Sequence, residues 1–292
     1  MLNSLTSHQP KTIMRSNTHK PRAMSPIHLP GLVNPHDLST DRQFSMNLAR
    51  GMEVLRAFTL ADAMLGNREI ADRTGLPKPT VSRLTYTLTL LGYLSRVEGL
   101  QKYRLGSGVL SLGYPLLANM HVRQIARPIM EKLARETGCS VNLGMRDRTH
   151  VVYVDAVRAD KGNAHLPDIG TTRPLLLSAI GFALILASPP TERAAILNYL
   201  KVHDKTVFDA SRAAHEEAQK LFAAEGYCHV TGVWRKEIHA VAVPIARPPG
   251  EPLLAMNCTL YARRAASKNL LRDVVPLLKE AARELENAQG LR

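Results

Sequence analysis

The spacing of apolar side chains predicts three helices in residues 44–92. In the first, Leu48, Met52, Leu55 and Phe58 recur every three or four residues and define one helix face. A short second helix is predicted at 67–75, followed at once by a third. These three helices are expected to form a small domain of their own.

A sharp turn separates the second helix from the third. Asn67 is a favourable N-cap for the second helix, and Gly75 can adopt the left-handed conformation that ends it. Pro79 suits the start of the third helix, because a proline there loses no hydrogen bond. Gly92 ends this helix, whose apolar stripe at helical spacing consists of Val81, Leu84, Leu88 and Leu91.

Residues 93–106 alternate as two short strands would, around a turn at Glu98 and Gly99. The order is therefore helix, short helix, sharp turn, helix and hairpin. This is the order of elements in a winged helix-turn-helix, assigned here to residues 44–106.

The rest of the chain has the pattern of a larger α/β domain. Residues 107–120 are predicted as a linker helix with Pro115 near its end, and 121–138 as an amphipathic helix that Pro128 should kink or start. The alternating or apolar segments that follow predict a mostly antiparallel sheet with strands at 139–145, 150–157, 227–230, 239–246 and 251–262. Residues 158–173 are expected to form a loop, and helices are expected at 176–187, 191–200, 210–225 and 267–287. The predicted fold class is α+β, with the second domain at 121–292.

The first 43 residues differ from the rest in composition. They are rich in Ser, Thr, Asn, His and Pro, and they contain no apolar run of the kind found in a signal peptide. We therefore expect a disordered tail at 1–43 and no export.

The charge of the chain favours an anionic partner. The 292 residues carry a formal net charge of +13, and the first 106 residues are about twice as basic per residue as the remainder. The longest apolar run, at 174–190, is shorter than the roughly 20 residues of a membrane span. Nucleic acid is thus favoured over a membrane. Three widely spaced cysteines fit a reducing, cytoplasmic setting.

A DNA interface is expected at the third helix and the hairpin. The N-terminal end of such a helix reaches base edges in the major groove, and its free N–H groups attract phosphate. The hairpin would lie on the flanking backbone. The predicted contact residues are Lys78, Pro79, Thr80, Ser82, Arg83, Tyr86, Arg96, Lys102 and Arg104. Arg83 can pair with guanine through two hydrogen bonds.

Catalysis and metal binding have little support in the sequence. Glycine-rich phosphate loops, dinucleotide motifs and H-E-x-x-H are missing. Cys228, His229 and His239 could be drawn as metal ligands, but buried thiols in strands explain the pattern better. His150 and Asp155 lie five apart on one strand and should face opposite sides. We expect no enzyme, no cofactor and no metal.

Several segments together closely resemble the IclR family of bacterial transcription regulators. They include LARGMEVLRAF, REIADRTGLPKPTVSRLTYTLTLLGYL, KYRLG, ARPIMEKLARETG, VVYVDAV, SAIGFALILA and GVWRKEIHAVAVPI, and they span residues 44–288. The resemblance implies a winged helix-turn-helix, a linker helix and a C-terminal effector-binding domain. It further implies dimers or dimers of dimers on palindromic double-stranded DNA, paired through the first helices and the linker. A small organic acid or aromatic compound would control them.

The resemblance also implies an effector pocket between the sheet and the helix at 176–187. Its lining here would be Ala179, Ile180, Gly181, Ile238, Ala240, Asn257 and Thr259. Leu177 and Phe182 stand where family members often have His and a basic residue, which suggests a less polar pocket, suited to an aromatic acid. For the apolar members, ordinary core packing stays an open alternative. So does a small-molecule-binding or catalytic α/β domain whose helix-turn-helix serves only dimerisation.

Overall fold

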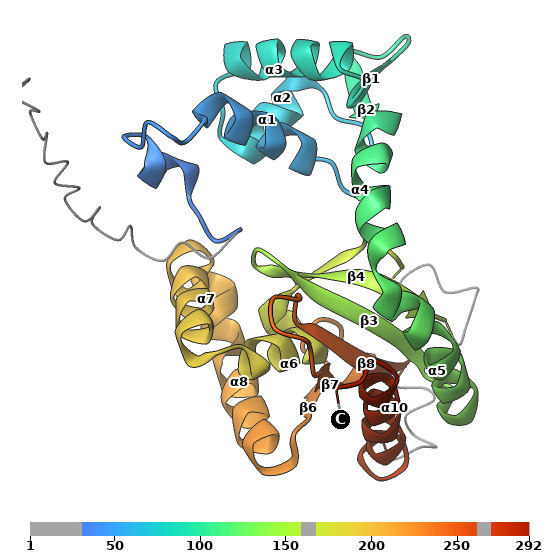
Figure 1. Ribbon diagram of the computed structural model, residues 1–292. Coiled ribbons are helices and arrows are strands. Elements are labelled where there is room, and N and C mark those ends of the chain that lie inside the picture. The colour runs from blue at the N-terminus through green and yellow to red at the C-terminus, as the bar shows by residue number, and fades with distance from the viewer. Residues whose placement is uncertain (1–30, 159–167, 262–269, 292) are drawn as a thin grey trace, which may run out of the picture.

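The computed structural model describes residues 31–158, 168–261 and 270–291, which form two domains joined by a helix (Figure 1). The smaller domain contains α1 (Met46–Arg56), α2 (Asn67–Thr74), α3 (Lys78–Leu90), β1 (Leu94–Val97) and β2 (Lys102–Leu105). The antiparallel pair β1–β2 is the expected hairpin. This winged helix-turn-helix agrees with the fold class predicted from the sequence.

The core of the smaller domain differs from the predicted stripes. Val81 and Leu88 are buried as expected, but Leu91 is 62% exposed, and on α1 Leu48 is 66% exposed. Gly51 and Val54 are the buried residues of α1. Leu48, Met52 and Leu91 instead line an outward-facing groove, because the buried face of each helix is turned away from them.

The linker helix is α4 (Ser107–Asn119), and α5 (His121–Thr137) follows after Met120. No side chain of α4 is buried in the single chain. By contrast, α5 is amphipathic, and it runs through Pro128 as one helix. Figure 1 shows α4 connecting the two domains.

The larger domain is built on a six-stranded sheet. Its strands are β3 (Ser140–Asp147), β4 (His150–Val157), β5 (Thr172–Pro174), β6 (Cys228–Thr231), β7 (Ile238–Ile245) and β8 (Leu254–Tyr261). They are ordered β5-β4-β3-β8-β7-β6, and every neighbouring pair is antiparallel. β5 lies in the predicted loop at 158–173, because three residues are too few to show a strand pattern.

Helices cover both faces of this sheet. α5 and α10 (Val275–Ala288) pack with residues such as Val141, Met256 and Cys258 on one face. The other face carries α6 (Ala179–Ala187), α7 (Pro190–His203) and α8 (Lys205–Glu225). α6 begins later than predicted, because η2 (Leu175–Leu177) is a 3₁₀ turn and the Ser178 hydroxyl accepts the Gly181 N–H at 3.2 Å. η3 (Leu270–Val274) is a π-helical turn ahead of α10.

The N-terminal segment is only partly described. The first 30 residues of the predicted disordered tail lie outside the described residues. For 31–43 the prediction of disorder is wrong, because η1 (Pro35–Leu38) forms a 3₁₀ turn and Leu32 is buried in the same core cluster of the larger domain as Val151 and Tyr153. Among the described helices, none is long and apolar enough to cross a membrane.

The two domains also touch directly at the β3–β4 turn. Asp147 pairs with Arg56 of α1 at 2.9 Å, and Arg148 pairs with Glu53 of α1 at 3.0 Å. Arg148 has a positive φ of 56°, which turns the hairpin tightly at this point. Each of the two pairs therefore joins opposite charges, and the acidic partner lies on the turn in one pair and on α1 in the other.

Candidate nucleic-acid interface and effector pocket

The N-terminal half of α3 presents a polar surface to solvent. Lys78, Pro79, Ser82, Arg83 and Tyr86 are exposed. Thr80, the remaining predicted contact on this helix, is half-buried on the side that faces α1. Pro77 precedes the helix, and among described residues no side chain caps its first turn. Its first N–H groups are therefore available to a phosphate.

Two features fix the angle between α2 and α3. Gly75 adopts a left-handed φ of 68°, and its N–H bonds the Ala71 carbonyl at 2.9 Å, which ends α2. Thr85, which the sequence pattern placed outside the apolar stripe, is fully buried. Its hydroxyl lies 3.0 Å from Asn67 Oδ1 and 3.1 Å from the Ser82 carbonyl. A buried polar side chain thus joins the start of α2 to the middle of α3.

The hairpin residues divide between the two faces of the wing. Arg96 lies opposite Tyr103, and Arg104 opposite Ser95, so the two arginines point to different faces. Both are exposed. Lys102 instead pairs with Glu69 of α2 at 2.9 Å. The Gly66 N–H and Lys102 together lower the pKa of the Glu69 carboxyl, which keeps it ionised in this contact. Lys102 therefore holds the wing to α2.

The start of α4 is packed tightly against the end of α3. Gly106 donates to the Tyr93 carbonyl at 2.8 Å, and a Cβ on Gly106 would lie 2.3 Å from the Gly92 oxygen. Only glycine fits this approach. The linker helix consequently continues from the winged domain through a rigid junction.

An apolar surface runs from this junction across the smaller domain. A groove of about 650 Å³ lies between α1, α3 and Leu112 of α4. Beyond it, α4 carries further exposed large apolar side chains, namely Leu110, Tyr114 and Leu116. An exposed apolar surface of this kind marks an interaction site.

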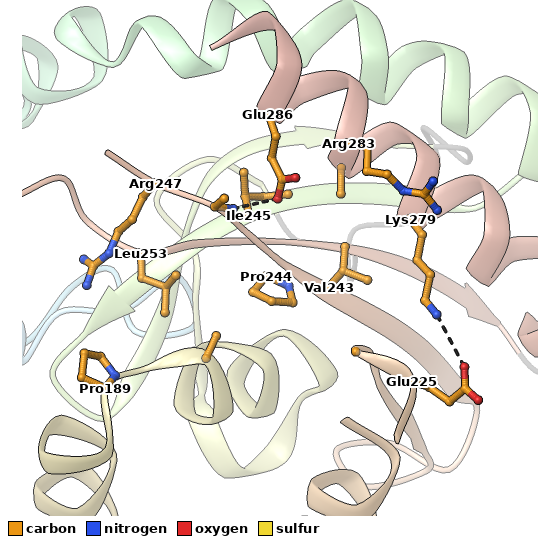
Figure 2. Close-up of a pocket in the computed structure, with 14 residues that line it drawn as sticks. Pro189, Glu225, Val243, Pro244, Ile245, Arg247, Leu253, Lys279, Arg283 and Glu286 are labelled. Atoms are coloured by element: carbon orange, nitrogen blue, oxygen red, sulfur yellow. Dashed lines mark hydrogen bonds and ion pairs between the residues drawn. The ribbon is translucent and has the colours of Figure 1, made fainter. Parts of the chain in front are cut away.

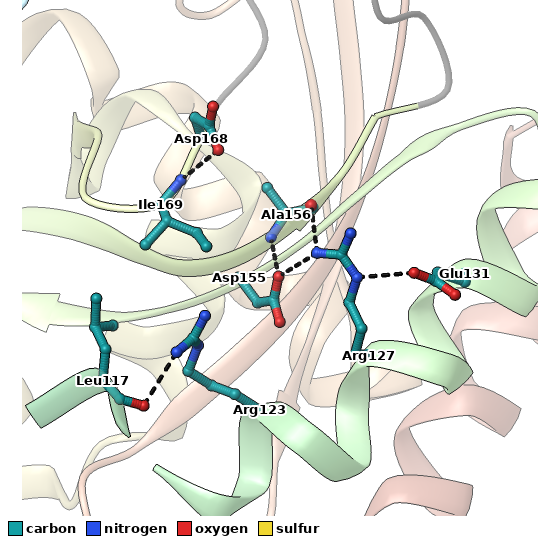
Figure 3. A network of polar contacts seen from close by, with 8 residues as sticks. All are labelled: Leu117, Arg123, Arg127, Glu131, Asp155, Ala156, Asp168 and Ile169. Atoms are coloured by element: carbon teal, nitrogen blue, oxygen red, sulfur yellow. Dashed lines mark hydrogen bonds and ion pairs between the residues drawn. The ribbon is translucent and has the colours of Figure 1, made fainter. Parts of the chain in front are cut away.

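The far end of α4 is tied to the larger domain by a polar network (Figure 3). Arg123 donates to the Leu117 carbonyl at 3.0 Å, across the α4–α5 junction. Arg127 donates to the buried carboxylate of Asp155 at 2.8 Å and to Glu131 at 2.9 Å. The adjacent carboxylates raise the pKa of Arg127, with Glu131 the larger cause. The network fixes α5 on β4 directly below the linker.

A pocket lies on the α6 face of the sheet, where the sequence placed the effector site. Five of the seven predicted residues line it, namely Ala179, Ile238, Ala240, Asn257 and Thr259. The other two do not line it. Ile180 is fully buried, and its Cδ1 would lie 3.1 Å from a Cβ on Gly144 of β3, so it faces the sheet. Gly181 faces the Leu175 backbone.

The floor of the pocket contains a buried chain of polar side chains. Asn142 Nδ2 donates to Asn257 Oδ1, and Asn257 Nδ2 donates to Thr259 Oγ1, each at 3.0 Å. The amide assignments follow from this network. Thr259 thereby presents its hydroxyl to the pocket. Tyr153 adds a second hydroxyl, and burial raises the pKa of Tyr153 to about 12, so it stays protonated.

Two lining residues that the sequence reasoning missed form the opposite side of the pocket. Arg173 of β5 lies over the indole of Trp234, with its Cζ 3.3 Å from the ring centroid. Leu177 also lines the pocket, as its place in the family pattern suggested. Phe182 lies instead in the core against His215, so it does not shape the pocket. The one sequence signal that could have pointed to this side of the pocket was Trp234, the sole tryptophan of the chain.

A larger hollow of about 640 Å³ lies elsewhere, between β7, α10 and the end of α6 (Figure 2). Three of its charged side chains are engaged with neighbours. Glu286 accepts the Ala246 N–H at 2.9 Å, Lys279 lies 3.7 Å from Glu225, and Arg247 donates to the Glu251 carbonyl. The α6 pocket has the buried chain of polar side chains described above, and it is therefore the candidate effector site.

The thiols and histidines are placed as structural residues. All three cysteines are buried, and burial raises the pKa of Cys228 to about 12. His229 and His239 both approach the Thr231 hydroxyl, at 3.2 and 3.4 Å. Within the described ranges, no group of three or more His, Cys, Asp or Glu side chains could hold a metal ion.

Comparisons with known proteins match this architecture. The family described as "Bacterial transcriptional regulator IclR C-terminal" matches residues 115–287, and "IclR helix-turn-helix domain" matches 47–98. The HTH-type transcriptional regulator TsaQ1/TsaQ2 of Comamonas testosteroni is 30% identical over 82% of this chain and 87% of its own length. The p-hydroxybenzoate hydroxylase transcriptional activator of Acinetobacter baylyi is 25% identical over 88% of this chain and 97% of its own.

A solved structure is similar over both domains. The IclR family transcriptional regulator from Brucella abortus has 40% sequence identity and a TM-score of 0.78, covering 85% of this chain and 94% of that one. The matches span the winged helix-turn-helix, the linker and the sheet domain. The chain therefore belongs to the IclR family of DNA-binding bacterial transcriptional regulators.

Proposed function

We propose that the protein reads a palindromic operator in the cytoplasm, with α3 in the major groove and the wing on the flanking backbone. The observation that carries this proposal is the exposed, uncapped N-terminal half of α3. Arg83, Ser82 and Tyr86 lie on its solvent face and are the proposed base readers. Lys78, Pro79 and Thr80 lie at its start, near the first phosphates. Arg96 and Arg104 add backbone charge, with Lys102 positioning the wing.

A mobility-shift assay on the DNA upstream of the protein's own gene tests this proposal. Arg83→Ala should weaken binding to the preferred sequence by about 10-fold or more, since a bidentate guanine contact contributes about 1–3 kcal/mol. Arg42→Ala, which removes a charge ahead of α1, is the matched control and should change the affinity little. Equal affinities for Arg83→Ala and the native protein would remove Arg83 from the base readers.

The second candidate function is a ligand-binding or catalytic domain whose helix-turn-helix only dimerises. The observation that favours pairing is the exposed apolar surface on α1 and α4, with Leu110 72% exposed. We propose that this surface joins two copies, and that pairs of dimers form on longer operators. Leu110→Glu with Leu112→Glu should give monomers by sedimentation. If the double variant is monomeric and the native protein binds no DNA, this second function is favoured.

We propose that a small organic acid, preferably aromatic, binds the α6 pocket and controls DNA binding. Arg173 and the start of α6 offer positive charge on one side, while Asn257 and Thr259 offer hydrogen bonds on the other. Leu177 and Val233 make the walls between them apolar. The relative named as a p-hydroxybenzoate hydroxylase activator supports an aromatic acid.

A thermal-shift screen distinguishes the effector classes. Benzoate and 4-hydroxybenzoate should raise the melting temperature, and Thr259→Val should reduce the rise for 4-hydroxybenzoate more than for benzoate. If only short polar acids such as pyruvate or glyoxylate stabilise the protein, the aromatic class is wrong. For either class of acid, effector binding would change the affinity for DNA by favouring one arrangement of the two domains.

A further inference from the structure

We propose that Trp234 is a lid over the effector pocket, that Arg173 holds it closed, and that an aromatic carboxylate opens it by capturing Arg173. This inference rests on the proposed effector function of the pocket. It adds a gate and two residues that select the ligand.

The closing contact joins the two opposite edges of the sheet. Arg173 lies on β5, the first strand in the sheet order, and Trp234 lies in the loop after β6, the last one. The Arg173 Cζ is nevertheless 3.3 Å from the centroid of the indole, and both side chains line the pocket. A contact between the two edges must pass over the sheet face between them, and that face holds the pocket.

The pocket is too small for its proposed ligand while this contact is made. Its volume is about 40 Å³, whereas a cavity that takes up benzene measures about 150 Å³. An aromatic acid therefore requires a wall to move. Without such movement the pocket has room for about one water molecule.

Trp234 is the wall best able to move. Asn257, Thr259 and Tyr153 lie on paired strands of the sheet and are buried. Trp234 is half-buried and lies in a loop that starts at Gly232, whose φ is +68°. Between 232 and 238, two backbone hydrogen bonds hold this loop: Gly232 N–H to the Ile238 carbonyl, and Ile238 N–H to the Arg235 carbonyl. Its indole can thus swing outward without breaking the sheet.

The exchange of partners at Arg173 makes the gate selective. In the structure, the guanidinium interacts with the π face of the indole. A carboxylate offers it a charge-assisted, bidentate hydrogen bond, which is stronger than the ring contact. The ring of the ligand then fills the space that the indole leaves. A neutral aromatic compound supplies the ring without the carboxylate and should open the lid poorly.

The fluorescence of the full-length protein tests the lid directly, because Trp234 is its sole tryptophan. Titration with benzoate should shift the emission to the red in a saturable manner, and benzyl alcohol should not. Without ligand, Arg173→Gln should shift the emission to the red and increase quenching by acrylamide. Arg235→Gln is the matched control, because Arg235 lies 4.6 Å from the same ring without lining the pocket. It should not increase quenching by acrylamide, because the indole should stay in place.

Calorimetry separates the lid from the ligand class. Trp234→Ala should bind benzoate about 10-fold more tightly, which corresponds to 1.4 kcal/mol, while Arg173→Gln should bind it at least 10-fold more weakly. Unchanged or weaker binding by Trp234→Ala, or benzoate binding without an emission change, would overturn the lid and leave the effector proposal standing. If benzoate and 4-hydroxybenzoate bind neither the native protein nor Trp234→Ala, the aromatic class and its gate both fall.

Discussion

Replacing Gly181 by Ala should destabilise the effector domain, although alanine is the better helix former. A Cβ at this position would lie 2.0 Å from the Leu175 oxygen and 2.6 Å from the Leu175 Cα. Leu175 is fully buried, and its N–H donates to the Thr149 carbonyl at 3.0 Å. The Leu175 backbone would therefore have to move by about 1 Å or more to reach ordinary contact distance.

The expected loss follows from three contributions. Overpacking costs about 1–3 kcal/mol, and weakening the Leu175 hydrogen bond adds about 1 kcal/mol. The helix propensity of alanine returns about 1 kcal/mol. The net destabilisation of about 1–3 kcal/mol is a large part of the roughly 5–15 kcal/mol that holds a typical domain folded.

Urea denaturation followed by Trp234 fluorescence measures this loss, because the sole tryptophan lies in the effector domain. The urea concentration at the midpoint of unfolding should fall by about 1 M. Gly51→Ala on α1 is the control, since its Cβ would meet only Leu84 Cδ2, at 3.9 Å. Because α1 lies outside the domain that contains Trp234, the unfolding of this variant is followed by circular dichroism, and the substitution should be neutral or slightly stabilising. A midpoint for Gly181→Ala within error of the native value would refute the steric reasoning.

Three further predictions concern the charged groups. Arg127→Met should lower the free energy of unfolding, measured by urea denaturation, by about 1–3 kcal/mol. The Asp155 side chain is only 5% exposed and would lose its cationic partner. Arg56→Glu should loosen the domain contact and increase proteolysis in the linker, and adding Asp147→Arg should restore it; the half-exposed pair contributes only about 0.5 kcal/mol. Burial lowers the pKa of His215, so its neutral form is favoured on folding. Stability from this group is complete above the ordinary pKa of 6.5 and falls as the pH drops below it, a loss that His215→Leu should reduce.

Periodicity in the sequence predicted the helices well, but it could not say what each apolar face contacts. Leu48, Met52 and Leu91 have helical spacing, yet they are exposed in the single chain. A surface reserved for another copy produces the same pattern as a core. Thr85 shows the converse, because its burial depends on the partner Asn67, which lies 18 residues earlier.

The pocket was predictable only where the strands alternate. Asn257 and Thr259 lie two apart on β8 and share a face, so their inward direction follows from sequence. Arg173 lies on one edge strand of the sheet and Trp234 follows the other, and no local sequence pattern encodes the contact between their side chains. Ile180 and Gly181 belong to the correct helix, but the rotation of α6 turns them toward the core.

The path of the chain places attachments on two sides of the winged domain. Leu32 is packed in the effector domain before the chain enters α1, and α4 returns it to the effector domain after the wing. Because the winged domain is attached at two separate points, it can rotate about the line that joins them, and other rotations are restricted. Arg148, which pairs with Glu53 of α1, lies beside the first of these attachments, since a Cβ on Gly31 would be 3.1 Å from its Cγ. In the proposed dimer, the two α3 helices would then change their separation by rotation about this line. Removing the residues up to 40 would release one attachment and allow rotation in other directions.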